Sequence, residues 1–201
     1  MDEQSKTSTK DKILKTAAKM FSESGYDKVS TREIANAIGI NSATLYYYFT
    51  SKDDILKSLY KFYSAQRSKE APDINELLRL VETEPPHRVL MRTEFHYNEE
   101  YREILDQILA IAVREINADP ESERFIQENT FDSINNTLKP LIERMMELGK
   151  IEPIDTDVFL RVLAYYCFSA AALNKSAFGQ SIIEYHKGMS LVFSTIIPVE
   201  I

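Results

Sequence analysis

Apolar residues recur at helical spacing along almost the whole chain. Between residues 10 and 24 the apolar positions form one stripe of a helix, and the lysines fall largely outside that stripe. The stripe consists of Ile13, Leu14, Ala17, Ala18 and Phe21. Gly25 follows directly and predicts the end of this first helix.

Three further helices are predicted before residue 70. Ser30 and Glu33 have the spacing of a capping box, in which each side chain satisfies a free backbone donor of a helix start. Gly39 predicts the end of that second helix, and Asn41 is expected to cap a short third helix that reaches Phe49. Ser51 is expected to cap a fourth helix over residues 52–69.

Ala71-Pro72-Asp73 interrupts the pattern, and helical spacing resumes beyond it. The further helices are expected near 73–82, 87–97, 99–117, 121–148, 155–174 and 180–196. Pro140 falls inside the fourth of these, and we expect it to kink or split that helix. No alternating strand pattern or internal repeat is present, so the chain is predicted to be all-α, with about nine or ten helices.

The segment 29–56 carries the most specific information about function. It reads as a short helix, a glycine turn, a second short helix and then a third that opens with Ser51-Lys52, which is the layout of a helix-turn-helix. Tyr46, Tyr47 and Tyr48 follow one another at about 100° per residue, so they cannot all share one face. Leu45 and Phe49 supply the buried side, and at least one or two tyrosines must point outward.

The same segment resembles the N-terminal head of the TetR family of repressors. The resemblance covers about fifty residues, whereas the rest of the chain matches that family only in its helical character. The matching elements are Phe21 with Gly25-Tyr26, Ser30-Thr31-Arg32-Glu33-Ile34-Ala35, Gly39-Ile40, Leu45-Tyr46-Tyr47-Tyr48-Phe49 and Ser51-Lys52-Asp53. The resemblance implies a helix-turn-helix domain over 1–56 and a helical effector-binding and dimerisation domain over 57–201, joined by the helix over 52–69.

The resemblance also implies roles for individual residues of the head. The predicted contacts with the DNA phosphate backbone come from Thr31, Thr44, Tyr46, Tyr48 and Lys52, and those with base edges come from Arg32, Ser42 and Ala43. Tyr47 completes the predicted DNA-binding set. Two alternatives stay open: Arg32 could be a solvated partner of Glu33 or Glu23, and Lys52 could be an ordinary surface lysine at a helix start.

For the body, the resemblance implies a cavity for a small apolar or aromatic effector. The candidate lining residues are Phe62, Phe95, His96, Tyr101, Phe131, Tyr165, Tyr166 and Phe168. The alternative is that these aromatic residues simply belong to the core. The last two helices carry more apolar surface than one subunit needs, which favours a homodimer joined through them, although burial within one subunit is the alternative.

Charge and composition narrow the choice of function. The chain has a net charge of −7, but residues 1–60 hold nine Lys and Arg against eight Asp and Glu, so the head is nearly neutral and the body is acidic. The chain has a single cysteine, Cys167, so no internal disulfide is expected. It also starts with polar residues and has no apolar run long enough to span a membrane. Together these features predict a cytoplasmic protein.

No catalytic motif stands out in the sequence. It contains no nucleophile elbow, phosphate loop or paired histidine ligands, so we expect neither an enzyme nor a metal site or cofactor, although His96 lies among glutamates. The predicted function is a sequence-specific transcriptional regulator that binds a double-stranded DNA operator, most simply a repressor released by an effector. A regulator controlled without a small molecule is the main alternative; the sequence does not identify the effector or the operator.

Overall fold

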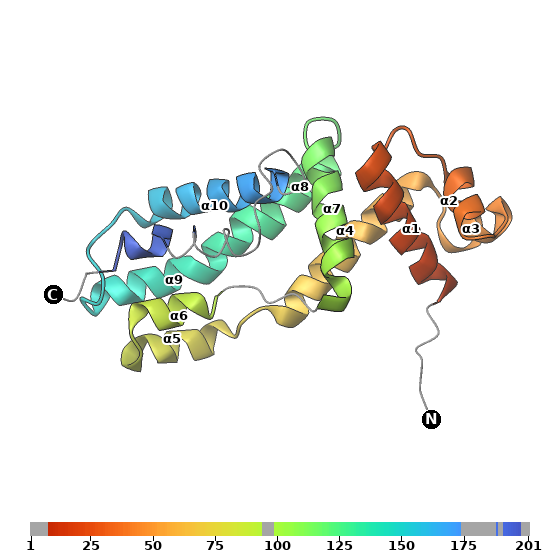
Figure 1. The fold of residues 1–201 in the computed structure, drawn as a ribbon. Coiled ribbons are helices and arrows are strands. Elements are labelled where there is room, and N and C mark those ends of the chain that lie inside the picture. Colours follow the sequence, from red (N-terminus) through yellow and green to blue (C-terminus); the bar gives the residue numbers. More distant parts are fainter. Residues whose placement is uncertain (1–7, 94–98, 174–187, 189–190, 198–201) are drawn as a thin grey trace, which may run out of the picture. The chain divides into compact units, whose positions relative to one another are not determined.

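The computed structural model describes residues 8–93, 99–173, 188 and 191–197, and the fold of these residues is helical. Their labelled elements are ten α-helices, α1–α10, and one π-helical stretch, η1 (Figure 1). A short helical turn follows at residues 191–194, and the described residues contain no strand. The predicted all-α class is therefore confirmed. Across the described part of the chain, no helix is both long and apolar enough to cross a membrane.

The first four helices follow the predicted boundaries closely, because each has a local start or stop signal. They are α1 (Thr9–Ser24), α2 (Thr31–Ala37), α3 (Ser42–Tyr48) and α4 (Lys52–Glu70). The remaining helices are α5 (Ile74–Thr83), α6 (Pro86–Met91), α7 (Glu99–Glu115), α8 (Pro120–Ile126), α9 (Ser133–Glu147) and α10 (Thr156–Leu173).

Two helix predictions were wrong in the body. The helix expected near 87–97 is shorter, since α6 ends at Met91 and residues 92 and 93 form a turn. The segment 121–148 is not continuous α-helix: α8 gives way to the π-helical η1 (Gln127–Asp132) before α9 begins. Pro140 does not split a helix, since α9 runs through it with Leu138 and Leu141 buried on either side. Most of the predicted last helix, 180–196, lies outside the described residues, although residues 191–194 are helical.

Backbone contacts divide the chain into two compact units. The first combines residues 1–66 with 98–125, and the second combines 67–97 with 126–201. This division reflects packing, since α7 lies against α1 in the first unit. The predicted functional division at residues 56 and 57 concerns a different property, and it stays a prediction.

The first unit is built around the apolar face of α1. Ile13, Ala17 and Phe21 on that face are fully buried. Further along α4, the Tyr60 ring stacks on Phe125 with ring centroids 4.4 Å apart, and its hydroxyl lies 2.7 Å from the Ser122 hydroxyl. Burial raises the pKa of Tyr60, so this phenol stays protonated at neutral pH and can take part in the hydrogen bond.

The second unit has its own apolar core, in which α9 packs against both α5 and α10. The core consists of Leu77, Val81, Val89, Leu90, Leu138, Leu141, Ile142, Met145, Ile151, Leu160, Leu163, Phe193 and Ile196. The independent core explains why this part of the chain forms a compact unit of its own.

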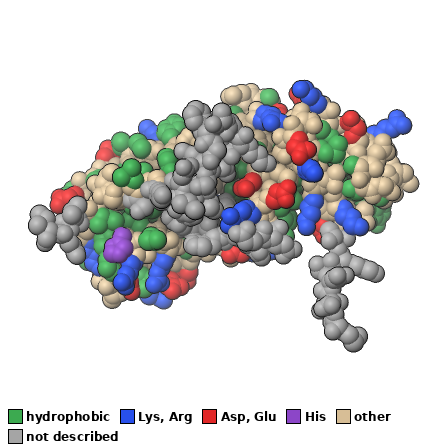
Figure 2. All heavy atoms as spheres, viewed as in Figure 1, with side chains coloured by type: hydrophobic (Ala, Val, Ile, Leu, Met, Phe, Trp, Pro, Cys, Tyr) green, Lys and Arg blue, Asp and Glu red, His purple; other side chains and the backbone are tan. Residues whose placement is uncertain are grey.

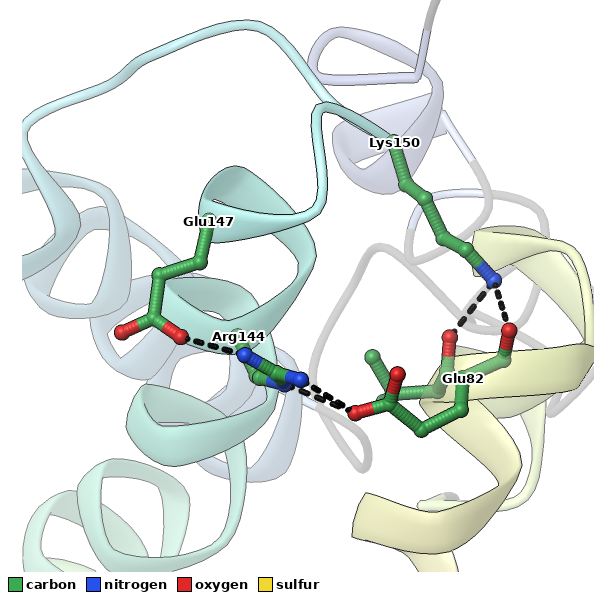
Figure 3. Close-up of polar contacts among 5 residues, drawn as sticks. Glu82, Arg144, Glu147 and Lys150 are labelled. Atoms are coloured by element: carbon green, nitrogen blue, oxygen red, sulfur yellow. Dashed lines mark hydrogen bonds and ion pairs between the residues drawn. The ribbon is translucent and has the colours of Figure 1, made fainter.

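Two cations join the end of α9 to α5 (Figure 3). The Arg144 guanidinium donates to one Glu82 oxygen at 2.8 and 2.6 Å, and its third nitrogen reaches Glu147 at 2.8 Å. The Lys150 ammonium lies 2.6 Å from the Val81 carbonyl oxygen and 3.1 Å from those of Glu82 and Glu84. Lys150 therefore caps the last carbonyls of α5, which have no partner within the helix.

We expect Lys150→Met to lower the free energy of unfolding by about 1–3 kcal/mol, because several carbonyls lose a charged donor. Lys139→Met is the matched control, since it removes an ion pair with Asp157, whose side chain is 64% exposed, and exposed pairs contribute little. Urea unfolding of both variants measures the difference. Equal losses would show that Lys150 is no more than a surface charge.

Candidate nucleic-acid interface

The head is a three-helix arrangement whose second and third helices are very short. Helices α2 and α3 have seven residues each, and such helices are marginal in isolation. They depend on tertiary burial: α2 packs against α1 and α3, and Ile34, Leu45 and Phe49 are all but fully buried. The predicted inward placement of Leu45 and Phe49 is thus confirmed.

Local hydrogen bonds define both short helices. The Ser30 hydroxyl accepts from the Glu33 amide at 3.2 Å, and a Glu33 carboxylate oxygen accepts from the Ser30 amide at 2.7 Å, so the predicted capping box is confirmed. Hydrogen bonds from Ser30 lower the pKa of Glu33. The Asn41 side-chain oxygen caps α3 by accepting from the Thr44 amide at 2.7 Å. Between the two helices, Gly39 has φ of +73°, a conformation that other residues rarely adopt.

All three tyrosines of α3 are exposed to solvent. Their exposed fractions are 50% for Tyr46, 83% for Tyr47 and 37% for Tyr48. The Tyr46 hydroxyl lies 3.1 Å from the Thr31 hydroxyl, which ties the exposed side of α3 to the start of α2. The rings of Tyr47 and Tyr48 meet edge to face with centroids 5.1 Å apart. These phenols therefore lie where a partner outside the chain can reach them.

The three residues predicted to contact base edges are exposed as well. Arg32, Ser42 and Ala43 are exposed on α2 and α3, and Thr44 is half-buried. The Glu33 carboxylate is occupied by the backbone and hydroxyl of Ser30. An ion pair between Arg32 and Glu33, the alternative role for Arg32, would therefore compete with the helix cap that Glu33 already forms with Ser30.

Lys52 has contacts within the chain that the sequence analysis did not predict. Its ammonium donates to the Tyr26 carbonyl at 3.0 Å and lies 4.2 Å from the centre of the Tyr26 ring. Tyr26 also donates its hydroxyl to Asp53. Sequence reasoning assigned no role to Tyr26, because 26 positions separate it from Lys52 and only the fold brings them together.

Basic side chains are spread over the surface of the part formed by α1–α3 (Figure 2). Lys12, Lys15 and Lys19 are exposed on α1, as their positions outside the apolar stripe predicted. Lys10 is exposed on α1 as well, and its ammonium lies 5.7 Å from the centre of the Phe49 ring. The head therefore exposes several cations although the chain as a whole is acidic.

The described effector-lining candidates make ring contacts within each compact unit. Phe62 and Tyr101 meet edge to face at 5.8 Å in the first unit. In the second unit the Phe131 ring lies 5.6 Å from that of Tyr165 and 6.3 Å from that of Phe168. Tyr166 is half-buried, and burial raises its pKa. Phe95 and His96 lie outside the described residues.

Residues 13–59, which contain all these head contacts except those of Lys10, match the family model described as "Bacterial regulatory proteins, tetR family". The head of this chain belongs to the tetR family. The resemblance inferred from the sequence is therefore confirmed for this segment.

Curated relatives match only part of this chain. The HTH-type transcriptional regulator YttP of Bacillus subtilis is 36% identical in an alignment of 86 residues that covers 38% of this chain and 42% of YttP. The biofilm operon icaADBC negative transcriptional regulator IcaR of Staphylococcus aureus is 44% identical over 52 residues, 26% of this chain and 28% of IcaR. The chain thus spans less than half the length of these relatives.

Solved structures match the fold over nearly the whole chain. The TetR family regulator PfmR of Thermus thermophilus has a TM-score of 0.65 at 22% identity, covering 93% of this chain and 96% of PfmR. A transcriptional regulator of Saccharomonospora viridis, solved in complex with choline, also scores 0.65 at 20% identity, covering 94% and 98%. At these identities the likeness shows that the tetR-type head continues into a body of the same fold.

We expect Asn41→Ala to lower the free energy of unfolding by about 0.5–2 kcal/mol, because α3 loses its only side-chain cap among the described contacts. Asn41→Ser retains an acceptor and should lose much less. Thermal and urea unfolding of the two variants test this expectation. If the serine variant lost as much as the alanine variant, the cap would not explain the effect.

Proposed function

We propose that this chain is a sequence-specific DNA-binding transcriptional regulator, acting as a homodimeric repressor that a small molecule releases from its operator. One observation carries the proposal: a tetR-type helix-turn-helix exposes Tyr46, Tyr47 and Tyr48 on its third helix. Tyrosine hydroxyls, threonine hydroxyls and lysines are common phosphate contacts, whereas arginine reads guanine in the major groove. The proposal includes all the predicted DNA-binding residues, which are Thr31, Arg32, Ser42, Ala43, Thr44, Tyr46, Tyr47, Tyr48 and Lys52.

Repression is supported by the match to IcaR, which is named a negative transcriptional regulator. Effector control is supported by the fold, since a similar structure was solved in complex with choline. For the repressor to be released, the effector must bind more tightly to a conformer that does not fit DNA than to the conformer that does. Phe131, Tyr165, Tyr166 and Phe168 are the best candidates for effector contacts in the second unit, with Phe62 and Tyr101 in the first.

Dimerisation is supported by the unusual surface of α10. Val158, Val162 and Tyr165 are spaced to share one helix face, and each is more than half exposed, at 54%, 58% and 59%. The opposite face of α10 is buried through Leu160, Leu163 and Ala164. An exposed apolar stripe on a helix already packed on its other side fits a second copy of the same chain.

The decisive test measures binding to the region upstream of the chain's own gene by fluorescence anisotropy. We expect the wild type to prefer this DNA over unrelated duplex and to bind more weakly as salt rises. Lys52→Ala should weaken binding to all sequences and lower the slope of log affinity against log salt by about one. Arg32→Ala should relax the preference at one base position by about 1–3 kcal/mol.

Lys69→Ala provides the control for charge, since Lys69 is exposed at the other end of α4. It should leave both the affinity and the salt slope unchanged. Wild-type binding that shows neither sequence preference nor salt dependence would contradict the proposed function.

The oligomeric state tests the dimer separately. We expect Val162→Glu to convert the dimer to a monomer in sedimentation velocity, because two buried carboxylates would face each other across the interface. Met91→Glu is the matched control, since Met91 is exposed to a similar degree on α6. A dimer that survives Val162→Glu, or one that Met91→Glu also dissociates, would place the interface elsewhere.

A further inference from the structure

The Lys52 side chain at the start of α4 is held on two sides by one residue. Its ammonium donates to the Tyr26 carbonyl at 3.0 Å and lies 4.2 Å from the centre of the Tyr26 ring, within the range of a cation–π interaction. A free lysine side chain samples many rotamers, so two simultaneous contacts restrict where this charge can lie.

Tyr26 is itself fixed by contacts on other sides of its ring. Its ring and that of Phe21 meet edge to face, with centroids 5.1 Å apart and planes at 67°, and Phe21 is fully buried in the head. Its hydroxyl donates to Asp53, the residue after Lys52. Burial and the neighbouring Asp53 carboxylate raise the pKa of Tyr26, so the hydroxyl remains a donor at neutral pH.

The ammonium keeps capacity for a further partner. Lysine has three donors, and the Tyr26 carbonyl uses one of them. Lys52 is only half-buried, so its remaining donors can reach a phosphate oxygen without first breaking the contacts with Tyr26. A charge that is already placed loses less conformational freedom when it binds.

We propose that Tyr26 is a positioning residue for DNA binding, which holds the Lys52 ammonium ready for a phosphate; this rests on the proposed DNA-binding function. The ring and the carbonyl of Tyr26 act on Lys52, and the hydroxyl acts on Asp53.

The two parts of Tyr26 can be separated by substitution. Tyr26→Leu removes the ring and keeps the carbonyl, whereas Tyr26→Phe keeps the ring and the carbonyl and removes only the hydroxyl. We expect Tyr26→Leu to lower the salt slope of operator binding by up to about 0.9, the value for one lost phosphate contact, as Lys52→Ala does. Tyr26→Phe should retain the wild-type slope.

A double-mutant cycle distinguishes positioning from a merely structural effect. In the Lys52→Ala background, Tyr26→Leu should cause no further loss of slope, because the charge that Tyr26 positions is already gone. Thermal unfolding of each variant identifies losses caused by instability of the head. Additive losses in the cycle, or an unchanged slope for Tyr26→Leu, would overturn the positioning role.

A measurement on the wild type needs no substitution at all. The ring of Tyr26 should shift the NMR signals of the Lys52 ε-methylene protons upfield relative to those of the exposed Lys69. Signals at the same position as those of Lys69 would overturn the proposal. Failure of the wild type to bind DNA would instead contradict the proposed function, so the two failures are distinguishable.

Discussion

Burial of one face of α1 is the constraint on which the head depends. Ile13, Ala17 and Phe21 are fully buried, and α1 contacts both α2 and α7. Two helices of seven residues could not hold a surface in place by their own backbone hydrogen bonds. With their apolar sides buried, their opposite sides are presented rigidly, which is what a set of DNA-contacting hydroxyls requires.

The same burial organises the charge of the head. Phe21 from the α1 face supports the ring of Tyr26, and Tyr26 supports the ammonium of Lys52. A hydrophobic contact is thereby linked through one aromatic ring to a cation on the surface. A nearly neutral head can therefore bind a polyanion such as DNA, because the position of each cation matters more than the net charge.

The features of the head that could be predicted are those that depend on residues close together in the sequence. The capping box of Ser30 and Glu33 and the Asn41 cap involve residues three apart, so the sequence alone determined them. The pairing of Tyr26 with Lys52 depends on the fold, and no spacing signals it. In the body, Pro140 suggested a break, but the irregularity lies at Gln127–Asp132, where backbone hydrogen bonding changes without any proline or glycine.

The π-helical stretch connects the two proposals made for the second unit. Phe131 lies within η1 and meets Tyr165, which belongs to the exposed face of α10. Arg67 donates to the Asn129 carbonyl at 3.4 Å and to the Ser133 hydroxyl at 3.2 Å, so side-chain donors help to hold this irregular backbone. Under the proposed function, an effector that displaced the Phe131 ring would also disturb its contact with Tyr165 on the dimer face. Effector binding and subunit association would then be thermodynamically linked.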